Sequence, residues 1–265
     1  MYTPFDFNEA IGHKKEYIED NLREGSPVVG MAYDGGLLLL TMRRTQRKIY
    51  EIYDRQMFSA IGKQADIENV RLSSIQYAHQ EGFERSPDDV SVQRLVGFYL
   101  SPALKKAFGD QWAAPFIIRC LFAESGRTPE QDVFLTLNYD GEFRQHRRVA
   151  VIAGTQRAED RMLERLSDNR PPLSRDEALR QAVWAWTAGA RESLKATSRI
   201  SRDIEEEEPI PLYEIDEAEA DRVFLRDELK TAQLEVGLLE RRANRESRFR
   251  LMREDELQDL LSTII

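Results

Sequence analysis

The sequence predicts an α+β protein in which two antiparallel sheets pack face to face and helices cover both outer sides, a four-layer αββα sandwich. Three observations support this fold class. Strands occur in two blocks, and paired helices follow each block. Turns such as Asp34-Gly35-Gly36 separate runs of period two, as in hairpins. No Pro-, Gly- or Ser-rich linker divides the chain. A single domain over residues 1–265 is therefore favoured, and a tandem of two α+β domains is the alternative.

The first part of the chain is expected to form one helix, four strands and two helices. Asp6 and Glu9 have the spacing of a capping box, and Gly25 is a natural stop for the helix that they begin. Apolar runs with period two then predict strands over residues 27–33, 37–42, 48–54 and 57–61. A helix capped by Asp66 is expected over residues 66–80, and the Ser-Pro-Asp of residues 86–88 begins another.

The second part repeats the pattern of strands followed by helices. Strands are expected over residues 115–124, 132–141 and 147–154. Two helices follow, and the second opens with the capping box of Ser174 and Glu177. Trp184 and Trp186 lie two apart on this helix and cannot share one face, so at least one should lie at a subunit contact or a sheet–helix interface. A strand over residues 231–240 and a helix over 254–264 end the chain.

Composition favours a soluble, cytoplasmic protein. The chain has 265 residues, of which 41% are hydrophobic, enough for a sizeable core. Its single cysteine, Cys120, lies in an apolar run and cannot form an internal disulfide, which favours a buried thiol in a reducing compartment. The N-terminus lacks the pattern of a secretory signal, and the longest apolar runs are too short to span a bilayer, so no membrane partner is expected.

The formal net charge of −9 belongs to one segment. Residues 202–228 hold twelve acidic residues and three arginines, a net of −9, so the remainder is neutral overall. The basic clusters at residues 43–48 and 144–148 are short and lack interleaved aromatic residues. We therefore expect no nucleic-acid partner.

Few residues could carry chemistry. The three histidines, His13, His79 and His146, lie far apart with no partner at metal-ligand spacing, so no metal site is expected. The sequence has no Gly-rich phosphate loop, no CxxC pair and no GxSxG motif, and no cofactor is expected. The junction of Gly25 and Ser26, where a helix becomes a strand, is the remaining candidate.

At this junction the chain resembles the 20S proteasome family. EYIEDNLREGSPVVGMAYDGG, residues 16–36, is similar to the end of the first helix and the first hairpin of an α-type subunit, in which a Glu-Tyr and a later Gly-Ser recur at this spacing. The segments at residues 48–63, 134–141 and 148–155 are similar to the bacterial, actinobacterial-type α subunit. The resemblance covers almost all of the chain except residues 200–229. It implies the N-terminal-nucleophile hydrolase fold, here with an N-terminal helix.

The resemblance also frames the question of catalysis. Active members cleave themselves before a threonine, whose freed amine acts as the base, while a lysine and a carboxylate assist. In this sequence the nucleophile position is Ser26, the lysine is Lys48, and the carboxylate position holds Met42. Loss of one positioned acid–base partner costs about 10²–10⁴ in rate. Pro27 and the helix expected before Ser26 depart further from the active pattern. No catalytic residue is therefore expected, and Ser26 is a vestigial nucleophile position.

By resemblance, the chain is a non-catalytic α subunit that forms a homo-heptameric ring on a ring of catalytic β subunits. Residues 1–25 would form a gate segment and the N-terminal helix, with Tyr2, Pro4, Phe5 and Phe7 obstructing the entry of protein substrates. Two alternatives remain open, an active N-terminal-nucleophile peptidase of the β type with its nucleophile at Ser26, and an unrelated protein-binding scaffold.

The resemblance further implies a docking site for activators. Family α subunits use the lysine at the position of Lys48, in a pocket between neighbours, to pair with the C-terminal carboxylate of a ring-shaped ATPase or other activator. Gly25 and Glu16 are expected to line the same pocket.

For the acidic insertion, residues 202–229, the resemblance supplies no template. We expect a surface insertion that projects from the outer side of the ring and is anchored by Ile210, Leu212 and Tyr213. Within it, residues 219–229 could form a helix.

Overall fold

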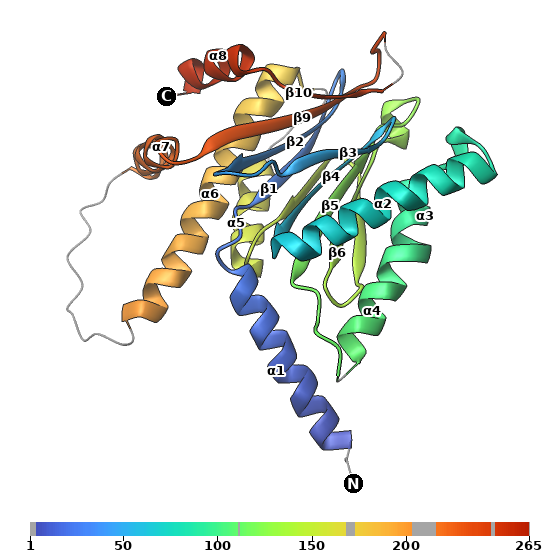
Figure 1. Cartoon of the computed structure of the whole chain (residues 1–265). Helices are drawn as coiled ribbons and strands as arrows, with labels where there is room; N and C mark the ends of the chain where they lie inside the picture. Colours follow the sequence, from blue (N-terminus) through green and yellow to red (C-terminus); the bar gives the residue numbers. More distant parts are fainter. Residues whose placement is uncertain (1–3, 111, 168–172, 203–215, 245–246, 265) are drawn as a thin grey trace.

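Two five-stranded antiparallel sheets form the centre of the molecule in the computed structural model (Figure 1). The structure describes residues 4–110, 112–167, 173–202, 216–244 and 247–264. The strand order is β10-β9-β2-β1-β8 in the first sheet and β3-β4-β5-β6-β7 in the second. Helices cover the outer face of each sheet, so the expected four-layer αββα sandwich is confirmed.

The first sheet draws its strands from both halves of the chain. Its strands are β1 (Val28–Tyr33), β2 (Gly36–Arg43), β8 (Val149–Ile152), β9 (Gln233–Glu240) and β10 (Phe249–Leu251). Those of the second sheet are β3 (Ile49–Tyr53), β4 (Gln56–Gly62), β5 (Ile118–Glu124), β6 (Val133–Asn138) and β7 (Phe143–His146). Because β1 pairs with β8 and β2 pairs with β9, the two halves share one sheet, and the tandem alternative is wrong.

The helices form the outer layers. Packed on the first sheet are α5 (Gln156–Leu166), α6 (Arg175–Arg202) and α8 (Glu254–Ile264). Packed on the second are α2 (Gln64–Glu84) and a continuous helical run made of α3 (Val92–Arg94), a π-helical segment (Leu95–Leu100) and α4 (Ser101–Gly109). Short 3₁₀ turns occur at Pro87–Asp89 and Pro129–Gln131. Two further helices, α1 (Pro4–Leu22) and α7 (Glu217–Glu228), pack at the end of the sandwich where α1 meets β1.

Strand β2 shows why an unbroken apolar run forms the centre of this fold. Leu38 and Leu40 face the helices α5 and α6, whereas Leu37 and Leu39 face the second sheet. All four side chains are fully buried. Successive side chains of a strand point to opposite faces, so a strand covered on both sides needs apolar residues at every position.

Three helix starts and one strand differ from the sequence-based expectations. The helix expected to begin at Ser86 begins at Val92 with Ser91 as its N-cap, and Ser86 caps a 3₁₀ turn. Helix α1 begins at Pro4, before the capping box expected at Asp6, with the proline in the first turn, where its missing N–H costs nothing. Asp66 lies inside the first turn of α2, and its carboxylate accepts a hydrogen bond from Ile117 N at 2.9 Å. The sequence did not predict β7, because this edge strand is largely exposed and has no apolar alternation.

Candidate functional site

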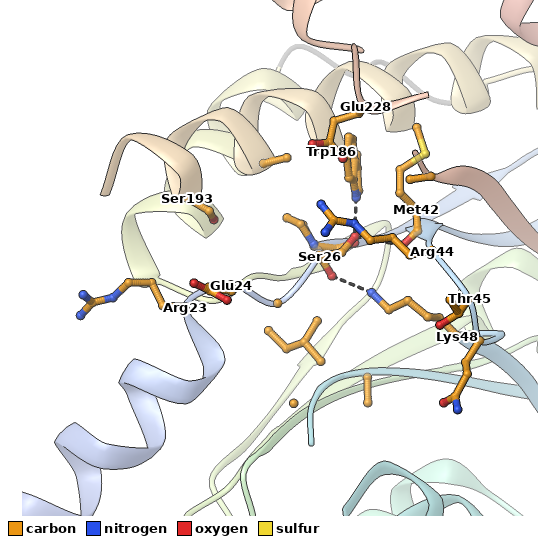
Figure 2. A pocket seen from close by; sticks show the side chains of 18 of the residues that line it. Arg23, Glu24, Ser26, Met42, Arg44, Thr45, Lys48, Trp186, Ser193 and Glu228 are labelled. Atoms are coloured by element: carbon orange, nitrogen blue, oxygen red, sulfur yellow. Dashed lines mark hydrogen bonds between the residues drawn. The ribbon is translucent and has the colours of Figure 1, made fainter. Parts of the chain in front are cut away.

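A cavity of about 550 Å³ opens where α1 ends and β1 begins (Figure 2). One wall comes from the junction at Gly25 and Ser26 and from the loop after β2, which carries Lys48. The opposite wall comes from Trp186 of α6 and from α7. The cavity therefore brings together segments from residue 23 to residue 232.

Among the described residues, the Ser26 hydroxyl contacts no acidic or basic side chain. The hydroxyl donates to Met42 O at 3.1 Å and lies 3.5 Å from Thr41 Oγ1. Met42 occupies the position where an active member would have a carboxylate, and its side chain is buried in the apolar layer between the first sheet and the helices. The Ser26 nitrogen is an amide within the chain, so it is not the free α-amine that an N-terminal nucleophile uses as its base.

Lys48 is held at the same junction by protein acceptors. Its Nζ donates to Ser26 O at 2.8 Å and to Thr41 Oγ1 at 3.1 Å. An ammonium has three N–H donors, so one remains for a ligand in the cavity. Burial lowers the pKa of Lys48 to about 7, and the Glu235 carboxylate opposes part of that effect. Glu235 also fixes the backbone here, because it accepts hydrogen bonds from the amides of Lys48 and Ile49.

Helix α1 is fixed to the sandwich at several points. Ile18 and Leu22 are fully buried and pack in the layer between the two sheets. Tyr139 donates to Glu19 Oε1 at 2.9 Å. The Lys14 ammonium donates to the carbonyl oxygens at the end of α4, those of Ala107, Phe108 and Asp110, at 3.3, 3.2 and 2.7 Å. The chain from Lys14 to Gly25 is therefore part of the fold.

Two glycines allow the chain to pack closely at the end of α1. A Cβ on Gly25 would lie 2.9 Å from Leu22 O and 3.0 Å from Ile61 Cβ. A Cβ on Gly154, in the turn after β8, would lie 2.4 Å from Leu22 O. These distances are shorter than a Cβ normally tolerates. The glycines of the Gly-Ser and Gly-Thr dipeptides therefore allow the two segments to approach the end of α1 closely.

Trp186 connects α6 to the junction. Its Nε1 donates to Pro27 O at 3.0 Å, and 2% of the residue is exposed. A buried indole N–H needs an acceptor, and the Pro27 carbonyl supplies it. This confirms the expectation that one of the two tryptophans lies at a sheet–helix interface. The other, Trp184, is partly buried against the same apolar layer.

Helix α7 contributes a wall that the sequence did not predict. Phe224 and Glu228 line the cavity, and the Phe224 ring lies 6.5 Å from that of Trp186 between centroids. Leu225 is fully buried in the layer of α5 and α6. The expected helix of residues 219–229 is present, but it packs on α6 instead of projecting. The expected anchors Ile210, Leu212 and Tyr213 lie outside the described residues.

Glu16 is not among the residues that line this cavity in the single chain, and the pocket expected for it lies between neighbouring subunits. Glu16 is exposed on α1, six residues before Leu22, or about 9 Å along the helix axis. Of the expected gate residues, Pro4, Phe5 and Phe7 belong to the first turns of α1, and Tyr2 lies outside the described residues.

The remaining candidates are dispersed. His13 and His79 are exposed, and His146 lies 3.2 Å from Thr136 Oγ1, with a pKa lowered by burial. Within the ranges that the structure describes, no three metal-ligating side chains converge. Cys120 is a buried free thiol. Among the described helices, none is long and apolar enough to cross a membrane.

Two antiparallel sheets packed between helical layers, with a helix leading into the first strand, are the architecture of the N-terminal-nucleophile hydrolase fold. The chain belongs to the proteasome subunit family, since the family model described as "Proteasome subunit" matches residues 22–200.

Within this family the chain is similar to subunits named proteasome subunit alpha. It is 31% identical to that of Actinosynnema mirum over 184 residues, 69% of this chain and 68% of the relative. It is 30% identical to that of Thermobifida fusca over 205 residues, 75% of this chain and 80% of the relative. It is 31% identical to that of Kineococcus radiotolerans over 202 residues, 74% and 83% of the two chains. The chain is therefore an α-type member of the family.

Proposed function

We propose that this chain is a non-catalytic α-ring subunit of a bacterial 20S proteasome, which gates substrate entry to the β-subunit chamber and docks activators. The observation that carries this proposal is the attachment of α1 to the fold. With Ile18 and Leu22 fully buried, residues 1–25 cannot be removed without exposing apolar core. Ser26 then stays internal and lacks the free amine that an N-terminal nucleophile requires.

The second candidate is an active peptidase with its nucleophile at Ser26. Lys48 favours it, since a lysine lies at the same junction, although its Nζ donates to the Ser26 carbonyl oxygen at 2.8 Å and not to the hydroxyl. The buried Met42 at the expected carboxylate position weighs against it, because a thioether cannot take the acid–base role of a carboxylate.

Intact mass of the chain distinguishes the two functions. When it is purified with the β subunits of its source, we expect the full 30.8 kDa chain and no labelling by a peptide epoxyketone. That reagent forms its stable cyclic adduct only with a hydroxyl that has a free amine beside it. A chain that has lost residues 1–25 and carries the label at Ser26 would contradict the proposal and establish the peptidase.

Gating is assigned to the first residues of the chain. In a homo-heptameric ring, seven copies of the segment with Tyr2, Pro4, Phe5 and Phe7 would converge on the axis and obstruct protein substrates. The anchors of α1 at Lys14 and Ile18 lie after this segment, so the segment can be removed without disturbing them.

Deletion of residues 2–8 is expected to open the gate. Turnover of a short fluorogenic peptide by the assembled barrel should rise several-fold, because the obstruction is removed while the β active sites are unchanged. Titration of the β sites with a covalent inhibitor provides the control for equal numbers of active sites. Equal peptide turnover by the wild-type and deletion barrels, at normal assembly, would refute the gating role.

Docking is assigned to the cavity beside Lys48. The one N–H of Lys48 without a protein acceptor would pair with the C-terminal carboxylate of a ring-shaped ATPase or other activator. Gly25 lines the same cavity, beside the path that such a chain end would take. Glu16, exposed on α1, would reach such a pocket only from a neighbouring subunit of the ring.

A further inference from the structure

We propose that α7 makes the cavity selective for a chain end that combines its terminal carboxylate with an apolar residue and a basic side chain, and that Glu228 recognises the base. This inference rests on the proposed docking function and adds the chemical class of the docked chain end. It also gives a role to the described part of the acidic insertion.

The charges that line the cavity are separated in space. Three basic residues of the β2–β3 loop, Arg44, Arg47 and Lys48, line one side of it, and Glu228 lines another from α7. Arg23 and Glu24 line a third side, at the end of α1 (Figure 2). In the part of the chain that the structure describes, neither Arg44 nor Glu228 forms an ion pair. A ligand with a negative and a positive group could therefore pair with both sides without displacing an existing partner.

An apolar surface joins the two charged sides. Trp186 and Phe224 line the cavity together with Leu194, which is 57% exposed. In Figure 2, Trp186 lies between Glu228 and the Ser26–Lys48 contact. A chain end with its carboxylate at Lys48 and a base at Glu228 would place an apolar side chain on this surface, where burial is favourable. The volume of about 550 Å³ is in the range of 300–1,000 Å³ found for sites of small ligands.

The position of α7 is well fixed. Asp221, 2% exposed, pairs with Arg191 and with Arg165, and Leu225 is fully buried. Glu228 lies one turn after Leu225 and is half-buried, so the backbone that carries its carboxylate is fixed beside the cavity. A pre-positioned acid discriminates between ligands better than a mobile one.

The experiment measures binding of short fluorescent peptides to the full-length chain by anisotropy at low salt. The first peptide ends in lysine, phenylalanine and leucine with a free carboxylate. In the second, norleucine replaces the lysine. Each is also made with an amidated end. The variants are Glu228→Gln and the matched control Asp227→Asn, since Asp227 is exposed on the same helix, pairs with Lys230 and does not line the cavity.

We expect the lysine peptide to bind wild-type protein about threefold more tightly than the norleucine peptide, as a partly exposed ion pair allows. In Glu228→Gln this ratio should fall to about one, and in Asp227→Asn it should stay at the wild-type value. Added salt should reduce the ratio in wild type, because partly exposed charges are screened.

Two different failures can be told apart. If the ratio of lysine to norleucine peptide is the same in wild type and Glu228→Gln, this inference is overturned, while the proposed docking function stands provided that free acids bind more tightly than amides. If free acids and amides bind equally, or no free acid binds, docking of a carboxylate at Lys48 is overturned, and this inference with it.

Discussion

Lys48→Ala is expected to abolish activator-stimulated protein degradation and to leave ring assembly intact. The ammonium lies against Ser26 O and Thr41 Oγ1 at the floor of the cavity, where a bound carboxylate would be largely shielded from water. Removal of one member of such a charge pair costs about 2–5 kcal/mol. This corresponds to a loss of activator affinity of about 30-fold to several thousand-fold.

Two controls separate docking from a general loss of structure. Lys63→Ala removes another lysine, which is exposed at the start of α2 and does not line the cavity, and its stimulation should be normal. Amidation of the C-terminus should lower the affinity of an activator peptide for wild type. It should not lower the affinity for Lys48→Ala any further, because both changes remove the same charge pair. Stimulation of Lys48→Ala rings at the wild-type level would refute the role of Lys48.

The charge state of Lys48 gives this docking a pH dependence. Burial lowers the pKa of Lys48 to about 7, so the fraction that is protonated in the unliganded protein falls as the pH rises above that value. A carboxylate binds the protonated form, and its affinity should therefore fall over the range from about pH 7 to about pH 9. The amidated peptide should show no such fall, which separates titration of Lys48 from any general effect of pH on the protein.

Much of the fold could be predicted because its strands are defined locally. The run from Leu37 to Leu40 specifies a strand buried on both faces, and the sequence alone places it after the hairpin turn Asp34-Gly35-Gly36. Strand β7 could not be predicted, because Phe143–His146 forms an edge whose pairing comes from its neighbour β6 and not from an apolar pattern. The start of the first helix was harder to predict. The capping motif favours a start at Asp6, but Pro4 also suits the first turn of a helix, and α1 begins there.

Only those residues of the candidate site that belong to a local sequence motif could be predicted. Gly25, Ser26 and Lys48 follow from the junction of helix and strand and from the family resemblance, and the structure brings them to one cavity. Phe224 and Glu228 could not be assigned in the same way. Periodicity identifies the helix that carries them, but its packing on α6 depends on a buried ion pair formed with residues far away in the sequence.

Asp221→Ala is expected to detach α7 from the body of the protein. Asp221 lies between Arg191 and Arg165 and is 2% exposed, while its partners come from α6 and α5. Removal of one partner of a buried ion pair costs about 3–5 kcal/mol, because charges remain unpaired in a poorly solvated place. Arg165 is 42% exposed and can be solvated again, so a value of about 3 kcal/mol is expected for the docking of α7.

The detachment should be visible as faster amide hydrogen exchange confined to α7 and as cleavage by trypsin after Arg222 or Arg226, with α1, α2 and both sheets protected as before. The matched control is Glu219→Ala, an exposed acid on the same helix whose pair with Arg222 spans 3.5 Å; it should change exchange little. Because α7 supplies Phe224 and Glu228 to the cavity, Asp221→Ala should also remove the preference for basic chain ends while Lys48 still binds a carboxylate. Unchanged protection of α7 in Asp221→Ala would mean that Leu225 and the apolar contacts hold the helix, and that the ion pair contributes little.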